Sequence, residues 1–386
     1  MSDLQEQVQA VIDGLVESGA ENGIQAAVYH RGKPIVDAVA GTAGPSVGAG
    51  EAGPSVGAGE ADASAPRMVA SDTLFYAASA VKGVAATVVH VLVEQGVFGY
   101  DTSVAEVWPE FGAHGKETAT VRHVLTHSAG VPAVPADLTL DQLCDWDGMC
   151  SLIAGFEPWW KPGERVGYHA VTFGFLVGEI IRRATGKPIS QVLAEGIGAR
   201  LGVADELFFG VPAEALDRVA HFEDDPEGTA VFASLPPDFP LFKAAPLHLF
   251  PNAAYANNPG LISSDVPAGG IVTARAMARM YAALLDEVDG VRLVSPTRLR
   301  EISSIATSGD DEMTGGPAQY GLGYTVGQLG GRPVPKTVFG HVGVGGGAAY
   351  ADTATGISVA VTKNRFNPVE MNAFDAVWDL ATRVLS

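Results

Sequence analysis

A serine and a lysine three positions apart, Ser79 and Lys82, are the side chains whose types and spacing most directly suggest chemistry. Residues three apart lie on one face of a helix, so the hydroxyl and the amine are expected side by side. A serine hydroxyl is a poor nucleophile at neutral pH and needs an adjacent base, and a lysine removed from water can be that base. Residues 83–95 are apolar almost all round, which predicts that the pair opens a buried helix.

Two downstream segments could complete such a site. Tyr168 follows a Pro-Gly turn signal and precedes an apolar run of helical period at 171–184, so it is expected on a loop just before a helix. Residues 337–347 combine a short strand with a glycine-rich segment around His341 and Gly343. Glycines let a strand approach a substrate closely, and a backbone N–H there can point at the oxyanion that forms during acyl transfer.

The expected order of elements indicates how these residues are held. Two apolar segments flank the turn Arg31-Gly32-Lys33 and predict a β-hairpin. A mostly helical stretch is expected from about residue 76 to 265, and an amphipathic helix is expected at each end of the chain. The later elements are expected as strands at 320–326, 337–339 and 357–362 and a C-terminal helix at 369–385.

This order predicts an α+β fold, with an antiparallel sheet flanked by terminal helices and an inserted, mainly helical lobe. One domain would comprise residues 1–75 and 266–386 and the other residues 76–265, with the serine in the cleft between them. Residues 235–259 are rich in proline and aromatic side chains and show little periodicity. They are expected to form a long loop that roofs the substrate pocket.

Ser79, Lys82, Tyr168 and the Gly340-His341-Val342-Gly343 segment, in this order and at these separations, resemble the serine β-lactamase and penicillin-binding-protein superfamily. Within it, the chain resembles the family VIII carboxylesterases, which are esterases built on the class C β-lactamase fold. The resemblance covers nearly the whole chain, from about residue 24 to 364. Supporting stretches are residues 120–130, 168–174 and 178–183.

The resemblance implies that Ser79 is the nucleophile and that Lys82 and Tyr168 share its proton. Which of the two takes that proton stays open. The residues implied beside the scissile carbonyl are His341 and Gly343 on the strand and, as oxyanion-hole donors, the backbone N–H groups of Ser79 and Val344. No metal or organic cofactor is implied.

One departure from the lactamase pattern favours esters as substrates. Lactamases carry an asparagine two residues after the tyrosine, and Ala170 stands there. His341 stands where they place a lysine. The resemblance therefore implies a serine carboxylesterase acting on short-chain carboxylic esters. A β-lactamase, a D-amino-acid amidase or peptidase, or an acyltransferase using the same site stays open as an alternative, and so does a catalytically silent ligand-binding relative.

A second serine signature competes with Ser79. Residues 44–52 and 53–61 are the same nine residues twice, and Ser46 and Ser55 each fit the G-x-S-x-G pattern of a nucleophile elbow. That elbow needs a strand before the serine and a helix after it, and the flanking Gly, Ala, Pro and Glu residues predict neither. The duplication is therefore interpreted as a flexible loop.

Composition narrows the class of partner. The formal charge of −20 and a pI near 4.7 argue against non-specific binding to nucleic acid or anionic membranes. The small-molecule ester expected as partner is what the family resemblance implies. No charged leader with an apolar core and no apolar run of spanning length is present in the sequence. Cys144 and Cys150 are expected to be free thiols, so a cytoplasmic location is predicted. The oligomeric state is left open.

Overall fold

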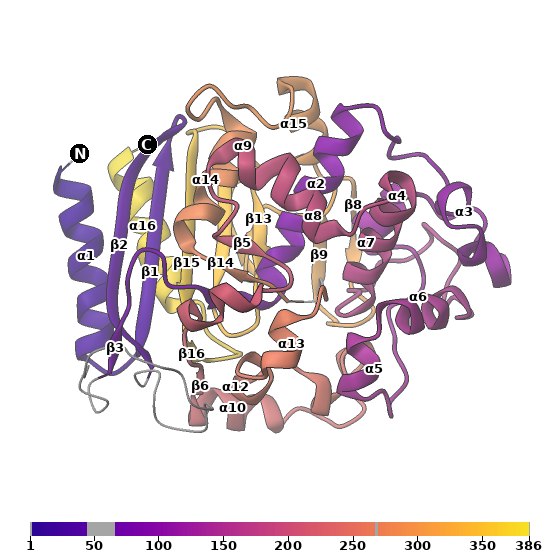
Figure 1. Ribbon diagram of the computed structural model, residues 1–386, viewed down its shortest axis with the longest axis horizontal. Helices are drawn as coiled ribbons and strands as arrows, with labels where there is room; N and C mark the ends of the chain where they lie inside the picture. The colour runs from indigo at the N-terminus through magenta and orange to yellow at the C-terminus, as the bar shows by residue number, and fades with distance from the viewer. Residues whose placement is uncertain (1, 45–65, 267–268, 386) are drawn as a thin grey trace.

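The computed structural model describes residues 2–44, 66–266 and 269–385. Its centre is a nine-stranded antiparallel sheet whose strands come from both ends of the chain (Figure 1). Across the sheet the strands are β3 (Arg67–Met68), β2 (Lys33–Gly44), β1 (Gly23–His30), β15 (Ile357–Lys363), β14 (Ala348–Asp352), β13 (Val338–Val342), β10 (Thr325–Val326), β9 (Pro317–Tyr320) and β8 (Thr307–Asp310). The predicted α+β fold with an antiparallel sheet is confirmed.

Different helices cover the two faces of the sheet. The terminal helices α1 (Ser2–Glu17) and α16 (Asn372–Leu385) pack together on one face, and α14 (Ala274–Leu285) packs on the other. Successive side chains of a strand point to opposite faces. Because both faces are covered, the central strands β1 and β15 are buried along nearly their whole length and are apolar rather than alternating.

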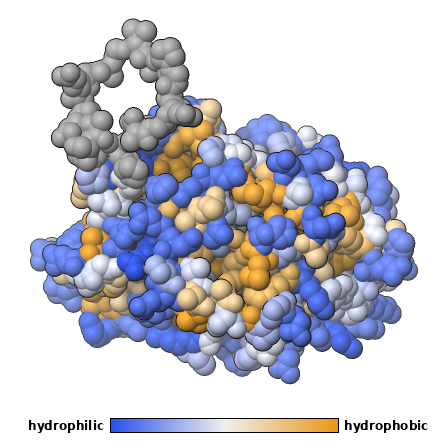
Figure 2. Space-filling model, turned by 90° about the horizontal axis from the view of Figure 1, so that it is seen from below, coloured by the Kyte–Doolittle hydropathy of each residue, from blue (hydrophilic) through white to orange (hydrophobic). Residues whose placement is uncertain are grey.

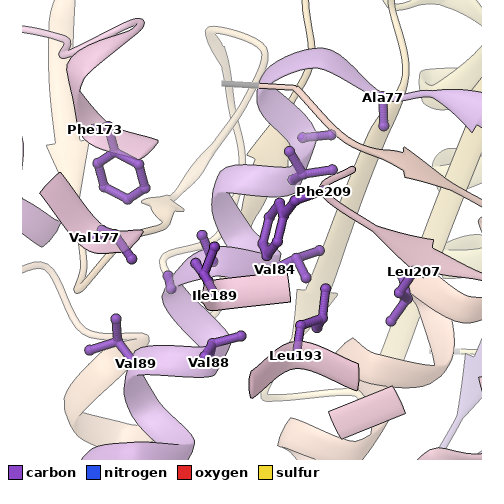
Figure 3. Close-up of a cluster of buried hydrophobic side chains, with 14 of the residues drawn as sticks. Ala77, Val84, Val88, Val89, Phe173, Val177, Ile189, Leu193, Leu207 and Phe209 are labelled. Carbon is purple, nitrogen blue, oxygen red and sulfur yellow. The ribbon is translucent and has the colours of Figure 1, made fainter. Parts of the chain in front are cut away.

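The helical part of the chain is built around α2 (Lys82–Glu94), which is buried from Lys82 to Val93. Figure 3 shows Val84, Val88 and Val89 of this helix packed among side chains from other helices, including Phe173 and Ile189. The neighbouring helices are η1 (Ala78–Val81), α3 (Val104–Val107), η2 (Pro109–Gly115), α4 (Val121–Leu125), α5 (Leu140–Cys144), α6 (Trp146–Ala154), α7 (Thr172–Thr185), α8 (Ile189–Leu193), η3 (Ala194–Gly198), α9 (Ala199–Leu201), η4 (Ala213–Arg218) and α15 (Pro296–Ile302).

Small sheets join the helical part to the large sheet. The short strands are β4 (Phe75–Tyr76) and β5 (Leu207–Phe208), which both pair with β7 (Ile271–Val272), then β6 (Glu223–Asp224), which runs parallel to β16 (Arg365–Phe366), and the hairpin of β11 (Gln328–Leu329) and β12 (Arg332–Pro333). Strand β4 is followed by the turn that carries Ser79, and its partner β7 is followed by α14. The pairing of β4 with β7 therefore places the start of the serine segment beside the start of α14. The proposed division into residues 1–75 with 266–386 and 76–265 stays a prediction.

The predicted roof loop is wrong in its secondary structure. This part of the chain forms the short helices α11 (Leu241–Ala244), η5 (Leu247–Leu249) and α12 (Ala253–Ala256), with α10 (Pro226–Ala233) just before it and α13 (Pro259–Ser263) beginning at its last residue. Local capping explains them: the Asn252 side chain accepts a hydrogen bond from the Tyr255 N–H, and Pro259 occupies the first turn of α13. Helices this short show no hydrophobic periodicity in the sequence.

Two predicted strands also have different limits. The strand predicted at 320–326 is divided into β9 and β10 by a turn in which Gly323 adopts a φ of +81°, and a Cβ at Gly323 would lie 2.3 Å from the Ala86 methyl group. The strand predicted at 337–339 continues as β13 to Val342, which brings His341 onto the sheet.

The duplicated segment after Gly44 lies outside the described residues. The face seen in Figure 2 is mostly hydrophilic, with hydrophobic patches between the polar residues. None of the helices in the described ranges is long and apolar enough to cross a membrane.

Candidate active site

Ser79 and Lys82 meet where η1 runs into α2. The Lys82 Nζ donates a hydrogen bond of 2.9 Å to the Ser79 Oγ. Ser79 lies in a 3-10 turn, with α2 beginning at Lys82, so the prediction that an α-helix opens at Ser79 is corrected by one turn. Ala78, the residue before the serine, adopts a φ of +44°. A non-glycine residue in this region is strained, and such strain often accompanies functional sites.

The Lys82 amine is fully buried, and burial changes its chemistry. Its side chain has no solvent exposure, and no Asp or Glu among the described residues forms an ion pair with it. Burial disfavours the charged ammonium and lowers the pKa of Lys82 to about 7. A large fraction of this amine is therefore neutral at physiological pH and can accept a proton from Ser79.

Tyr168 reaches the same place from the loop before α7, as predicted. Its backbone N–H donates to the Asp311 Oδ1 at 3.1 Å, and the Lys82 Nζ lies 5.1 Å from the centre of its ring. Burial raises the pKa of the Tyr168 phenol above its ordinary value, against a smaller lowering by the Ser79 hydroxyl. The phenol therefore stays protonated at neutral pH and can donate a proton.

Strand β13 forms the opposite wall of the site. Gly343 follows its last residue, and a Cβ at Gly343 would lie only 2.2 Å from the Ala77 carbonyl oxygen, so this strand end touches the turn that carries Ser79. The Gly343 N–H donates to the Gly347 oxygen at 2.7 Å. Within residues 2–44, 66–266 and 269–385, no acceptor pairs with the N–H of Val344, the next residue. The Val344 N–H is therefore free to bind an oxyanion.

His341 lies on β13 and is 97% buried, with 3% of its side chain exposed. Its Nδ1 donates to the Val342 carbonyl at 2.8 Å, which leaves a lone pair on Nε2, and that atom has no partner among the described residues. Burial lowers the pKa of His341 to about 3, and the protonated form of Lys82 contributes a smaller lowering. His341 is therefore neutral and adds no positive charge to the site.

Sequence reasoning missed two residues that hold Tyr168. Asp311 Oδ1 also accepts the N–H groups of Met313 and Thr314, which fixes the turn under the tyrosine. The ring of His127, a residue with a φ of +54°, lies 4.9 Å from the Tyr168 ring. The only sequence signal for His127 is its place in the supporting stretch 120–130. The sequence contains no signal that identifies Asp311.

Neighbouring polar groups have structural contacts. The buried His169 ring accepts from the Val131 N–H at 3.1 Å and donates to the Gly167 oxygen at 2.6 Å, so both of its nitrogens are paired with backbone. Cys144 and Cys150 are free, as predicted. Among the described residues, no group of three or more His, Cys, Asp and Glu side chains is placed to hold a metal ion.

Ser79, Tyr168 and His341 open into a cavity of about 530 Å³. Its far side is formed by the stretch predicted to roof the pocket, and that part of the prediction is confirmed. The roof side chains that line it are Phe232 just before the predicted stretch and, within it, Leu241, Leu249, Phe250 and Tyr255. Ala170, two residues after the tyrosine, lines the cavity beside them. The serine is thus accessible while its lysine is not.

Solved structures with this fold include several enzymes. A family VIII carboxylesterase aligns with a TM-score of 0.83 and 29% identity, covering 99% of this chain and 98% of that one. A penicillin-binding-protein homologue from Caulobacter crescentus aligns with a TM-score of 0.82 and 28% identity, again over 99% and 98% of the two chains.

Sequence comparison gives the same family. The esterase/β-lactamase LipL of Mycobacterium tuberculosis is 34% identical over 304 residues, which are 74% of this chain and 68% of LipL. Esterase EstB of Burkholderia gladioli is 26% identical over 78% of this chain and 80% of its own length. The Beta-lactamase family model matches residues 8–383, and the chain therefore belongs to the beta-lactamase family.

Proposed function

We propose that the protein is a serine carboxylesterase that hydrolyses short-chain carboxylic esters through an acyl-enzyme on Ser79. The observation that carries this proposal is the 2.9 Å hydrogen bond between the Ser79 Oγ and the buried Lys82 Nζ, whose pKa lies at about 7. A hydroxyl held against a neutral amine is an activated nucleophile. The catalytic roles below are part of the same proposal.

In the first half-reaction, neutral Lys82 accepts the Ser79 proton while the Oγ attacks the ester carbonyl. The developing oxyanion is held by the backbone N–H groups of Ser79 and Val344. Tyr168, whose pKa is raised by burial, donates its proton to the departing alcohol oxygen and regains one from the Lys82 ammonium. In the second half-reaction water attacks the acyl-enzyme, the same groups accept a proton from the water, and they return it to the Ser79 Oγ as the bond between this oxygen and the acyl carbon breaks and the acid leaves.

Esters are favoured over β-lactams by the relatives and by the site. The solved relative at 29% identity is a family VIII carboxylesterase, and EstB is an esterase. Ala170 supplies no side-chain amide, and the neutral His341 supplies no cation for a carboxylate. β-Lactam hydrolysis remains the second candidate because LipL, at 34% identity, is named both an esterase and a β-lactamase.

A panel of p-nitrophenyl esters of rising acyl length, run beside nitrocefin, tests the proposal. We expect the highest kcat/KM for acyl groups of about two to six carbons. A β-lactam would lack two contacts here, one to a side-chain amide at Ala170 and one to a cation at His341. Each lost buried hydrogen bond costs about 1–3 kcal/mol. Two such losses should lower lactam turnover by about two to four decades, at roughly 1.4 kcal/mol per decade. Equal or better turnover of nitrocefin would favour the lactamase alternative.

The cellular location of the enzyme and the class of its partner are also proposals. Two free cysteines support a cytoplasmic location, because that compartment keeps thiols reduced. The formal charge of −20 supports a small-molecule ester as partner rather than nucleic acid or an anionic membrane.

A further inference from the structure

The site described above contains more apolar space than a short acyl group can fill. We propose that its substrates are uncharged esters whose alcohol portion is bulky and aromatic, bound against the roof side chains Phe232, Leu241 and Phe250. This inference rests on the proposed esterase function and names the substrate class of the same site.

The size of the cavity is the first argument. Its volume of about 530 Å³ lies within the range of about 300–1,000 Å³ that is typical of pockets for drug-sized ligands. An acyl group of two to six carbons occupies a small part of such a space. The remainder must be filled by the other half of the ester or stay wet, and its aromatic wall is poorly suited to ordered water.

The character of the roof is the second argument. The Phe232 and Phe250 rings lie 4.3 Å apart between centres, and Phe232 also meets Phe242 edge-on at 5.6 Å. Phe232 and Phe250 both line the cavity. The first pair is tilted and the second edge-to-face, so the wall presents both ring faces and ring edges, against which a further aromatic ring binds favourably.

The position of the proton donor assigns this wall to the alcohol. Tyr168 must lie at the departing oxygen to protonate it, so the alcohol group extends from the phenol. Tyr168, Ala170 and Leu241 pack together around the buried side chains of Trp160, Ala244 and Met313. Because Ala170 and Leu241 also line the cavity, the surface that begins at Tyr168 continues directly into the roof.

The charge of the lining is the third argument. Of the described residues that line the cavity, Glu370 is the only one with a formal charge, since His341 is neutral and Lys82 is not part of the lining. An anionic alcohol portion would lose its water without meeting a cation, which is costly. A neutral aromatic group has no such penalty.

Matched aryl acetates test size and charge. Phenyl, 1-naphthyl and 4-biphenylyl acetate share the acyl group, and each kcat/KM is divided by the ester's rate with hydroxide to remove leaving-group acidity. We expect at least a tenfold rise of this ratio from phenyl acetate to one of the larger two. Methyl 4-acetoxybenzoate should exceed 4-acetoxybenzoate, its carboxylate analogue, by at least tenfold on the same scale.

Variants connect the preference to the roof. Phe250→Ala should remove most of the gain of the larger acetates over phenyl acetate, and Phe250→Leu should restore part of that gain. Val231→Ala is the matched control, because Val231 adjoins Phe232 on α10 but is 54% exposed and does not line the cavity. Circular dichroism and Tm verify that each variant is folded.

The outcomes separate this inference from the proposed function. Hydrolysis of none of the acetates would overturn the esterase itself. Hydrolysis of all of them with no gain from size, or with equal rates for the charged and uncharged pair, would overturn the substrate class and leave the esterase intact. Preference for phenyl 1-naphthoate over 1-naphthyl acetate would place the bulky group on the acyl side and contradict the assignment to the alcohol.

Discussion

At the scale of single residues, the central feature is a lysine whose burial makes a large fraction of its amine neutral at physiological pH. Burial lowers the pKa of Lys82 to about 7, and the amine keeps its hydrogen bond to the Ser79 Oγ. The same burial raises the pKa of the nearby Tyr168 phenol. One environment thus prepares a base and an acid within the same site, since desolvation opposes charge on both groups.

A pH profile follows from this arrangement. In the proposed mechanism the neutral amine is the active form, and its pKa is about 7, so kcat/KM for p-nitrophenyl butyrate should rise with pH and reach half its maximum near that value. The control is Lys82→Arg, whose guanidinium stays protonated, so its residual activity should not rise in this way. A wild-type profile that is flat across neutral pH would contradict the role of Lys82 as base.

The effects of replacing Lys82 and Tyr168 on kcat should also be non-additive. Lys82→Ala and Tyr168→Phe are each expected to lower kcat by at least about 10²-fold, the usual scale for losing general acid–base help. Because both act on one proton, the double variant should be little worse than the poorer single variant. Steady-state kinetics of the two single variants and the double variant measure this. If the fold-decrease in kcat of the double variant equals the product of the two single fold-decreases, Lys82 and Tyr168 act independently.

At the scale of elements, the site depends on a close approach between the end of β13 and the turn of Ser79. Gly343 has no side chain at the point where a Cβ would meet the Ala77 oxygen at 2.2 Å. Gly347, at the other side of the same connection, is different: a Cβ there would lie 3.5 Å from the Val361 oxygen, an ordinary contact. The two glycines therefore provide a matched pair.

Gly343→Ala should push the strand end away from the serine and misplace the Val344 N–H. Loss of an oxyanion-hole donor costs about 10²–10³ in kcat, and a loss of this order is expected. Gly347→Ala should retain activity. Kinetics and Tm of both variants test the claim, and equal activity of the two would mean that the approach of β13 is not needed for catalysis.

Much of this element-level arrangement could be predicted from the sequence, but its details could not. The S-x-x-K spacing, the Pro-Gly signal before Tyr168 and the glycines after His341 are local features. Together with the family resemblance, they predicted the residues that the structure brings together. The support of Tyr168 by Asp311 and His127 joins segments far apart in the chain. No local pattern encodes such contacts, and the short capped helices of the roof have too few turns to show a period.

At the scale of the whole molecule, both ends of the chain contribute strands to one sheet, and the helical part is connected to this sheet. The terminal helices were predicted correctly because each has a clear hydrophobic period, and the first hairpin because two apolar segments flank the turn at residues 31–33. The cavity was predicted only as a roofed pocket. Its walls come from β13, α10 and the segment around Glu370, so its volume and its near absence of charge required the folded structure.

The duplicated segment offers a test at this scale. It connects β2 to β3, whose residues Gly44 and Arg67 are already paired in the sheet, so a much shorter connection can join them. Deleting residues 53–61 should therefore leave both kcat/KM and Tm close to those of the full chain. Thermal melting and the p-nitrophenyl butyrate assay measure this. A large loss of activity in a folded deletion variant would give the repeat a catalytic role.

The most direct test of the account is to identify the acylated residue. The enzyme is quenched with acid during turnover of p-nitrophenyl butyrate, digested and mapped by mass spectrometry, with a sulfonyl fluoride adduct mapped in parallel. We predict that both labels lie on Ser79 and that Ser79→Ala abolishes the labels and the p-nitrophenol burst. A label on Ser46 or Ser55, or full turnover by folded Ser79→Ala, would contradict the proposal that Ser79 forms the acyl-enzyme.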